Sequence, residues 1–85
     1  MNWFLYILRS ISKPSKIYIG STNDLERRLK DHDNGNTRST KYFVPWEIAY
    51  SEEYKTKKEA RDRERQLKKW KNRERIEELI LRNTI

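Results

Sequence analysis

The 85-residue sequence contains no cysteine and a single histidine, His32. Without thiols the chain can form neither a disulfide framework nor a thiolate metal site, and one imidazole argues against a structural zinc. These absences favour an intracellular protein, which we place in the cytoplasm.

Long apolar runs are also missing. The N-terminal stretch Met1–Leu8 is too short to span a bilayer, and it lacks the basic lead-in and cleavage site of a secretory signal. We interpret it as a core strand and expect no membrane-spanning segment. A chain of 85 residues buries one modest core, and no repeat or low-complexity tract divides it, so residues 1–85 are predicted to form one domain.

Positive charge is in excess and is concentrated in one part of the chain. Twenty Lys and Arg against thirteen Asp and Glu give a net charge of +7. Residues 55–75 hold eleven basic and four acidic side chains, so the whole excess lies there. Such a basic face favours a polyanionic partner, with nucleic acid ahead of an anionic membrane. From charge alone, a solvated, salt-bridged helix surface is an equally good interpretation.

Three segments have the composition of β-strands. Trp3–Arg9 and Lys16–Gly20 are rich in aromatic and branched residues, and the polar residues 10–15 between them suit the loop of an antiparallel hairpin. Apolar side chains alternate onto both faces of the first strand, which predicts a central strand covered by helices on each side. Pro45–Tyr50 alternates well enough to be a third strand.

The first helix is predicted from its cap. Thr22 and Asn23 can both cap it, Asn23 with Glu26 three residues later has the spacing of a capping box, and the helix is expected to run to about His32. The turn residues 34–36 then end it, and residues 37–44 read as a polar loop.

Two further helices follow the third strand. Thr56 with Glu59 is another capping box, opening a helix through about Lys69, and Asn72 caps a last helix. The predicted order is strand, strand, helix, strand, helix, helix. This is an α+β fold with a small three-stranded sheet of antiparallel type, flanked by helices.

One face of the first predicted helix carries an arginine and an imidazole. Leu25, Arg28, Leu29 and His32 recur at helical spacing on this face. An arginine beside an apolar stripe either extends its stem along the core with its head in water, or clamps a phosphate with its planar guanidinium. Helical spacing alone gives the two interpretations similar weight.

A carboxylate lies on the apolar stripe of the second helix. Glu64 follows Ala60 by four residues and precedes Leu67 by three. A half-buried carboxylate must be paired, protonated or bound to a cation. Glu64 therefore either pairs with Arg61 or Lys68 or binds Mg²⁺, which takes few protein carboxylates and keeps several waters.

Two tyrosines on the predicted hairpin complete the candidate set. Considered alone, Tyr6 and Tyr18 are each best interpreted as ordinary strand aromatics. A phenol has a reference pKa of about 10, so it acts as a base at neutral pH only with help from a cation or a metal-bound water.

These residues together match a known pattern, because the chain resembles the GIY-YIG nuclease superfamily, most closely its small single-domain bacterial branch. Tyr18-Ile19-Gly20 is the second half-motif intact, and Phe4-Leu5-Tyr6 keeps the tyrosine of the first half-motif but not its glycine. Arg28, eight residues after Gly20, stands at the place of the family's catalytic arginine.

Further positions extend the resemblance. His32 matches a histidine found in many members, and Glu64 stands at the metal-ligand position of a similar helix. Pro45-Trp46 and residues 66–70 also look like the small branch, so the match runs from about Trp3 to Ile80. The asparagine that helps some members bind phosphate has no convincing counterpart here.

The resemblance implies a mechanism. Mg²⁺, or Mn²⁺, held by Glu64 and waters would stabilise the leaving 3′ oxygen, and Arg28 would stabilise charge on the non-bridging oxygens. A water would attack in line and lose its proton to Tyr6, Tyr18 or His32. The sequence does not choose among these three. We expect at least one tyrosine to act as base or to position the water, with His32 assisting.

The resemblance also implies a substrate class. It suggests a DNA endonuclease of low sequence specificity, preferring branched or damaged structures in repair or recombination, and it leaves RNA open as a substrate. An unidentified targeting partner or a dimer would supply selectivity that the chain lacks. Salt-sensitive backbone contacts are expected from the basic residues Lys55, Lys57, Lys58, Arg61, Arg65, Lys68, Lys69, Lys71, Arg73 and Arg75.

Two other functions explain the charge without catalysis. A nucleic-acid-binding module that has lost its activity would have no need of a carboxylate on a phosphate-facing surface. A small interaction protein that docks an acidic partner through its basic helix explains the charge but not the motif. The set Tyr6, Tyr18, Arg28 and Glu64 favours the nuclease over both.

Overall fold

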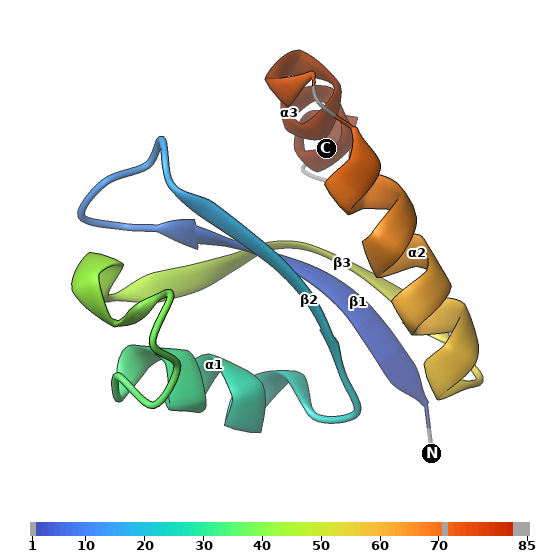
Figure 1. The fold of residues 1–85 in the computed structure, drawn as a ribbon, viewed down its shortest axis with the longest axis horizontal. Helices are drawn as coiled ribbons and strands as arrows, with labels where there is room; N and C mark the ends of the chain where they lie inside the picture. The colour runs from blue at the N-terminus through green and yellow to red at the C-terminus, as the bar shows by residue number, and fades with distance from the viewer. Residues whose placement is uncertain (1, 71, 83–85) are drawn as a thin grey trace.

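The computed structural model describes residues 2–70 and 72–82 (Figure 1). Of the predicted nucleic-acid-binding residues, Lys71 lies outside the described residues. The elements in chain order are β1 (Trp3–Ser10), β2 (Ile17–Thr22), α1 (Leu25–Asp33), a 3₁₀ turn (Lys41–Phe43), β3 (Trp46–Tyr54), α2 (Lys57–Lys69) and α3 (Arg73–Arg82). The predicted α+β fold and its order are confirmed.

The sheet has β1 at its centre. The strand order is β2-β1-β3, and both neighbours run antiparallel to β1. The β1–β2 hairpin places Tyr6 opposite Gly20, which brings the tyrosine of one half-motif beside the glycine of the other. Helix α1 covers one face of the sheet, whereas α2 and α3 lie on the other (Figure 1).

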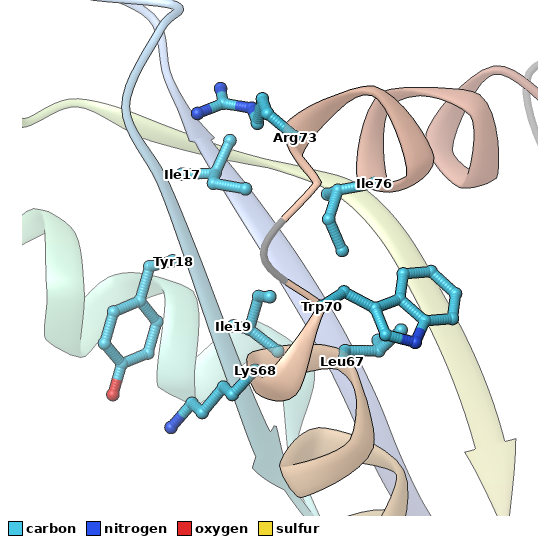
Figure 2. Close-up of a pocket in the computed structure, with 8 residues that line it drawn as sticks. All are labelled: Ile17, Tyr18, Ile19, Leu67, Lys68, Trp70, Arg73 and Ile76. Atoms are coloured by element: carbon cyan, nitrogen blue, oxygen red, sulfur yellow. The ribbon is translucent and has the colours of Figure 1, made fainter.

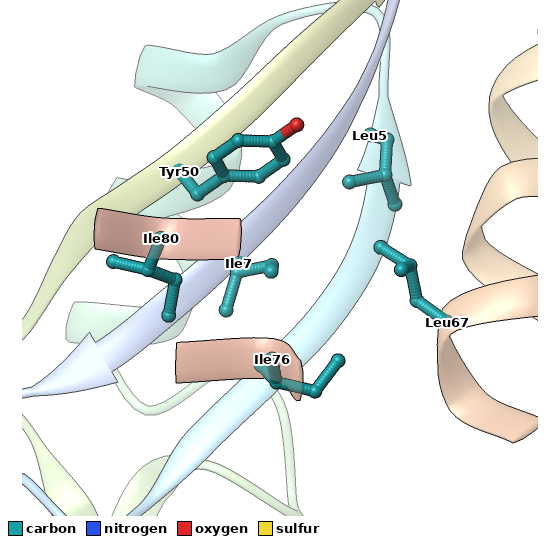
Figure 3. Packing of buried hydrophobic residues seen from close by; sticks show 6 residues of the cluster. All are labelled: Leu5, Ile7, Tyr50, Leu67, Ile76 and Ile80. Carbon is teal, nitrogen blue, oxygen red and sulfur yellow. The ribbon is translucent and has the colours of Figure 1, made fainter. Parts of the chain in front are cut away.

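Both faces of β1 are buried, as its apolar composition predicts. On the α2 and α3 face, the buried core contains Leu5, Ile7, Tyr50, Leu67, Ile76 and Ile80, which converge in Figure 3. On the opposite face, Tyr6, Leu8 and Trp46 are buried, with Leu25 and Leu29 of α1 packed against them. Burial of apolar area on both faces is the main favourable contribution to folding and holds the helices against the sheet.

The capping residue of α1 differs from the prediction by one position. Asp24, not Asn23, has the extended backbone of an N-cap, and its carboxylate accepts a hydrogen bond from the Arg27 N–H at 3.1 Å. The Thr22 hydroxyl accepts the Asp24 N–H at 3.1 Å, which holds Asp24 in place. Gly35, with φ of 77°, follows the helix as predicted, since this left-handed backbone suits glycine.

The helices of the second half begin where the sequence predicts. Thr56 caps α2, because its hydroxyl accepts the Glu59 N–H at 3.2 Å. The Asn72 side chain accepts the Glu74 N–H at 2.9 Å at the start of α3. No helix within residues 2–70 and 72–82 has both the length and the apolar character needed to cross a membrane.

Strand β3 is longer than predicted. It continues through the polar residues 51–53 to Tyr54, which pairs with Trp3 at the start of β1. Glu53 is exposed and Glu52 pairs with Arg63, and ladder hydrogen bonds to β1 outweigh the weak strand propensity of these residues.

Candidate active site

A polar pocket of about 290 Å³ opens at the end of β2, between the first half of α1 and the first half of α2. Four of the five predicted catalytic residues line it, namely Tyr6, Tyr18, Arg28 and Glu64. The other lining residues are Trp3, Gly20, Ser21, Lys57 and Arg61. Residues far apart in the sequence therefore meet in one place, as the phosphate-site hypothesis requires.

The strand geometry explains how one pocket draws on both faces of the sheet. Tyr6, Tyr18 and Gly20 are even-numbered positions of paired strands and face α1, whereas Ser21 faces α2. The pocket wraps around the end of β2, so the phenols reach it from one face and Glu64 from the other.

Gly20 is required by the position of the tyrosines. A Cβ at this position would lie 2.6 Å from the Tyr6 hydroxyl oxygen and 2.7 Å from the ring carbon that carries it. The Tyr18 ring would be 3.1 Å away. The glycine of the second half-motif thus leaves space for the tyrosine of the first.

The Tyr6 hydroxyl connects the two site residues of α1. The Arg28 Nε–H donates to it at 3.2 Å, and the His32 Nε2 atom lies 3.2 Å from it. Tyr6 is only 2% exposed and His32 is fully buried, so Tyr6 separates His32 from solvent. The sequence placed His32 on the correct helix face, but its position behind Tyr6 depends on how α1 packs against β1.

Hydrogen bonds hold both ring nitrogens of His32. Nδ1 lies 2.8 Å from the Thr40 hydroxyl oxygen, and Nε2 lies 3.2 Å from the Tyr6 hydroxyl oxygen. In the tautomer with its proton on Nδ1, the neutral imidazole donates to Thr40 and keeps a lone pair on Nε2 that accepts the Tyr6 O–H. A continuous chain of hydrogen-bonding contacts therefore joins Arg28, Tyr6, His32 and Thr40.

The pKa values of both central groups favour neutral forms at neutral pH. Burial raises the pKa of Tyr6 to about 12, although the hydrogen bond and charge of Arg28 oppose this. Burial also lowers the pKa of His32 to about 4, and the positive charge of Arg28 lowers it further. Arg28 itself stays charged, because a guanidinium keeps its proton in proteins.

Tyr18 lines the pocket beside this chain of hydrogen bonds. Its ring centroid is 4.7 Å from that of His32 and 6.3 Å from that of Tyr6. Figure 2 shows that the Tyr18 ring lies on the opposite side of β2 from Ile19. On the Ile19 side, a separate cavity of about 350 Å³ lies between β2 and helices α2 and α3.

The Glu64 carboxylate is held from two sides. Its Oε1 accepts a hydrogen bond from the Ser21 hydroxyl at 2.7 Å, and its Oε2 accepts from Lys68 Nζ at 2.6 Å. The side chain is 21% exposed. Of the two pairings considered for Glu64, the structure has the one with Lys68, and the paired carboxylate still faces the pocket.

The residues around Glu64 fit a hydrated magnesium ion. Each carboxylate oxygen keeps a free lone pair beyond its one hydrogen bond, and Mg²⁺ prefers such hard oxygen ligands while keeping several waters. Within residues 2–70 and 72–82, no three His, Asp or Glu side chains cluster as a metal cage. A metal at Glu64 would therefore keep most of its water ligands.

The described basic residues that are predicted to bind nucleic acid are exposed along and beside α2. Lys57 and Arg61 reach the pocket itself. Lys58 and Arg65 instead lie 3.0 Å and 3.8 Å from Asp62, so part of this face is salt-bridged, as the alternative interpretation proposes. The exposed predicted positions are Lys55, Lys57, Lys58, Arg61, Arg65, Lys68, Lys69, Arg73 and Arg75.

Two pocket residues were missed from the sequence. Ser21 follows the recognised Gly20 directly, and strand alternation turns it toward α2, which could have linked it to Glu64. Trp3 was assigned only to a strand, and its place at the pocket depends on how the first turn of α2 packs near it.

The comparisons with known proteins agree with this geometry. A model of the GIY-YIG catalytic domain family matches residues 2–77. The chain belongs to the GIY-YIG family. The half-motif tyrosines, Arg28 and Glu64, placed by resemblance to that family, are thus members of one pocket in a GIY-YIG domain.

Several relatives of this GIY-YIG domain are small bacterial proteins. The UPF0213 protein CPE1444 of Clostridium perfringens is 39% identical over 67 residues, which cover 78% of this chain and 70% of that protein. The UPF0213 protein YazA of Bacillus subtilis is 38% identical over 69 residues, covering 80% of this chain and 68% of YazA.

A solved structure and a longer relative complete the comparison. The solution NMR structure of the UPF0213 protein BH0048 from Bacillus halodurans has a TM-score of 0.55 and 28% identity, and the match covers 95% of this chain and 85% of that one. Structure-specific endonuclease subunit SLX1 of Debaryomyces hansenii is 46% identical over 50 residues, which are 52% of this chain but 14% of that protein.

Proposed function

We propose that this GIY-YIG protein is a metal-dependent endonuclease that hydrolyses phosphodiester bonds in DNA. The observation that carries the proposal is the convergence of two phenols, a guanidinium and a carboxylate on one pocket open to solvent. The name of the Debaryomyces hansenii relative, a structure-specific endonuclease subunit, supports selectivity for DNA structure over sequence. With such selectivity, branched or damaged DNA in repair or recombination is the proposed substrate. The proposed location is the cytoplasm.

Arg28 binds the scissile phosphate in this proposal. Its Nε–H is held by Tyr6, and a loose contact of 3.9 Å joins one terminal nitrogen to Asp31. Arg28 lines the pocket, and its remaining N–H groups can donate to the non-bridging oxygens, whose negative charge grows in the transition state. Anchoring through Nε orients the planar guanidinium before substrate arrives, which lowers the entropic cost of binding.

Tyr6 and His32 remove the proton from the attacking water. The Tyr6 oxygen takes the water proton while its own proton passes to His32 Nε2, so the phenol is regenerated and the imidazole becomes charged. The depressed pKa of His32 keeps Nε2 unprotonated and ready as an acceptor throughout the neutral pH range. The transfer uses the tautomer with its proton on Nδ1, in which Nδ1 donates to the Thr40 hydroxyl oxygen 2.8 Å away.

Glu64 is the proposed metal ligand, with Ser21 and Lys68 orienting its carboxylate. When bound there, Mg²⁺ or Mn²⁺ would supply Lewis-acid stabilisation to the scissile phosphate and the leaving 3′ oxygen. Tyr18, which lines the same pocket as Tyr6, positions the water in this proposal.

The exposed cations of α2 supply salt-dependent backbone contacts with little sequence readout. A single pocket cuts one strand at a time, so cleavage of both strands of a duplex requires repositioning, a second copy of the chain or a targeting partner.

The test is cleavage of labelled linear, nicked, flapped and four-way DNA, with Mg²⁺, with Mn²⁺ and with EDTA. Arg28→Ala and Glu64→Gln should each lower metal-dependent cleavage by about 10²-fold or more. The matched controls Arg82→Ala and Glu78→Gln, both on the exposed surface of α3, should cleave like the parent. Equal faint cleavage by all five proteins would point to a contaminant and leave a catalytically inactive nucleic-acid-binding module.

A further inference from the structure

An indole lines the polar pocket without belonging to the core. Trp3 at the start of β1 is half-buried and lines the pocket together with Glu64 and Arg61. Neither buried cluster of the described residues includes it. The Lys57 ammonium lies over the Trp3 ring, 5.3 Å from the ring centroid, so a cation–π contact brings positive charge to this aromatic face.

Arg61 is a cation of the same pocket without an acidic partner within residues 2–70 and 72–82. Its basic neighbours on α2 differ, because Lys58, Arg63 and Lys68 each pair with a carboxylate. Its exposed guanidinium is therefore available to an anion that enters the pocket.

The helix arranges these groups in a row. Glu64, Arg61 and Lys57 are separated by three and four residues, so they share one face of α2. With a rise of 1.5 Å per residue, Arg61 lies about 4.5 Å and Lys57 about 10 Å from Glu64 along the helix axis. The row leads from the proposed metal ligand to the Trp3 ring.

We infer that Trp3, Arg61 and Lys57 form a nucleotide-binding subsite next to the scissile phosphate, which takes an unpaired nucleotide of single-stranded or flapped DNA. The base takes the place of the Lys57 ammonium over the Trp3 indole, and the adjoining phosphate binds the Arg61 guanidinium and the displaced ammonium. This inference rests on the proposed nuclease function and specifies its substrate.

The physical basis of the selectivity is access to the face of the base. In a duplex both faces of each base are covered by neighbouring pairs, so only an unpaired base can lie flat on an indole. Base stacking on an aromatic side chain strengthens single-strand binding by about 5- to 150-fold. The subsite therefore selects DNA by its structure, and sequence has little influence because every base has an aromatic face.

Binding in EDTA tests the subsite separately from cleavage. The probes are a fluorescently labelled single strand, a flap and a fully paired duplex of the same sequence. Trp3→Leu should weaken single-strand and flap binding by at least about 5-fold and leave duplex binding nearly unchanged, whereas Trp3→Phe should retain most single-strand affinity.

Arg61→Ala tests the phosphate contact. It should weaken single-strand binding and reduce the slope of log affinity against log salt by about 0.7, the value for one phosphate contact. The control Arg82→Ala, on the distant α3, should leave affinity and slope unchanged. A thermal melt of each variant corrects the binding data for the folded fraction.

The results separate the two proposals. An unchanged ratio of single-strand to duplex affinity in folded Trp3→Leu would overturn the subsite, even if the parent cleaves DNA. If the variants show the expected binding losses but the parent protein never cleaves DNA, the subsite is supported and the nuclease function is overturned.

Discussion

Replacing Gly20 by alanine is the sharpest test of the pocket geometry. The new Cβ would lie 2.6 Å from the Tyr6 hydroxyl oxygen, whereas ordinary contacts of a Cβ are 3.4–4 Å. The Tyr6 ring must therefore move by roughly 0.8 Å, and it is buried against the core with little room to do so. The shift would lengthen the 3.2 Å contacts of Tyr6 with Arg28 and His32 beyond hydrogen-bonding distance.

Both stability and catalysis should fall. Overpacking of a core site costs about 1–3 kcal/mol of unfolding free energy, which corresponds to a decrease in Tm of roughly 5–20 °C for a domain of this size. Loss of the Tyr6–His32 proton transfer should lower kcat by about 10²- to 10⁴-fold. The loss of kcat exceeds what a smaller folded fraction explains.

Gly35→Ala is the matched control. Gly35 has φ of 77°, so alanine there costs about 1–2 kcal/mol, but its Cβ would make only an ordinary contact of 3.7 Å with Lys41. Thermal melts and single-turnover cleavage of a labelled flap should show loss of stability in both variants and loss of kcat only in Gly20→Ala. Parental kcat in folded Gly20→Ala would refute the assigned role of Tyr6.

Two further predictions concern stability. Because burial lowers the pKa of His32 to about 4, the unfolded chain binds more protons between about pH 6.5 and 4. The free energy of unfolding should therefore fall by about 3 kcal/mol as pH decreases through this window. Urea titrations of His32→Gln should show a smaller decrease. Equal pH dependence in the parent and the variant would contradict a buried, neutral His32. Burial raises the pKa of Glu52, but hydrogen bonds from Arg63, Tyr50 and Tyr54 lower it more, so its folded-state pKa is below its ordinary value. The ionised Glu52 carboxylate therefore stabilises the fold above its unfolded-state pKa, and this stabilisation is lost on acidification. Glu52→Gln should cost about 1–3 kcal/mol at pH 7 while cleavage by the folded protein stays at the parental rate, since Glu52 is not a pocket residue.

The elements of the fold were predictable where the signal is local. Thr56 capped α2 as expected, because a capping box involves residues within one turn. Asn23 and Asp24 are both good capping residues, and the choice of Asp24 depends on the hydroxyl of Thr22 that holds its N–H. The end of β3 was missed because polar residues there are held by pairing with β1, which local composition does not report.

The candidate site divides in the same way. Helical spacing made Arg28 and Glu64 candidates, and the resemblance to the family assigned their roles and that of the half-motif with Gly20; the structure brings all three to one pocket. Trp3 and Ser21 were missed because nothing in their neighbouring residues indicates a pocket. Their positions follow from the way α2 crosses the end of the sheet.

The sequence by itself determined the local features of this protein: the strand alternation, the helix caps, the basic character of α2 and the motif that shows its family. The alternation and the caps depend on residues within a few positions of one another, where short-range sterics and hydrogen bonding act, and the motif is read from residue types and their spacing along the chain. Only the tertiary structure decided which of the candidate bases line the pocket: Tyr6 and Tyr18 do, whereas His32 is fully buried and contacts the Tyr6 hydroxyl. The contact between Tyr6 and His32 joins residues 26 positions apart, so it arises from strand register and from the packing of α1 against β1.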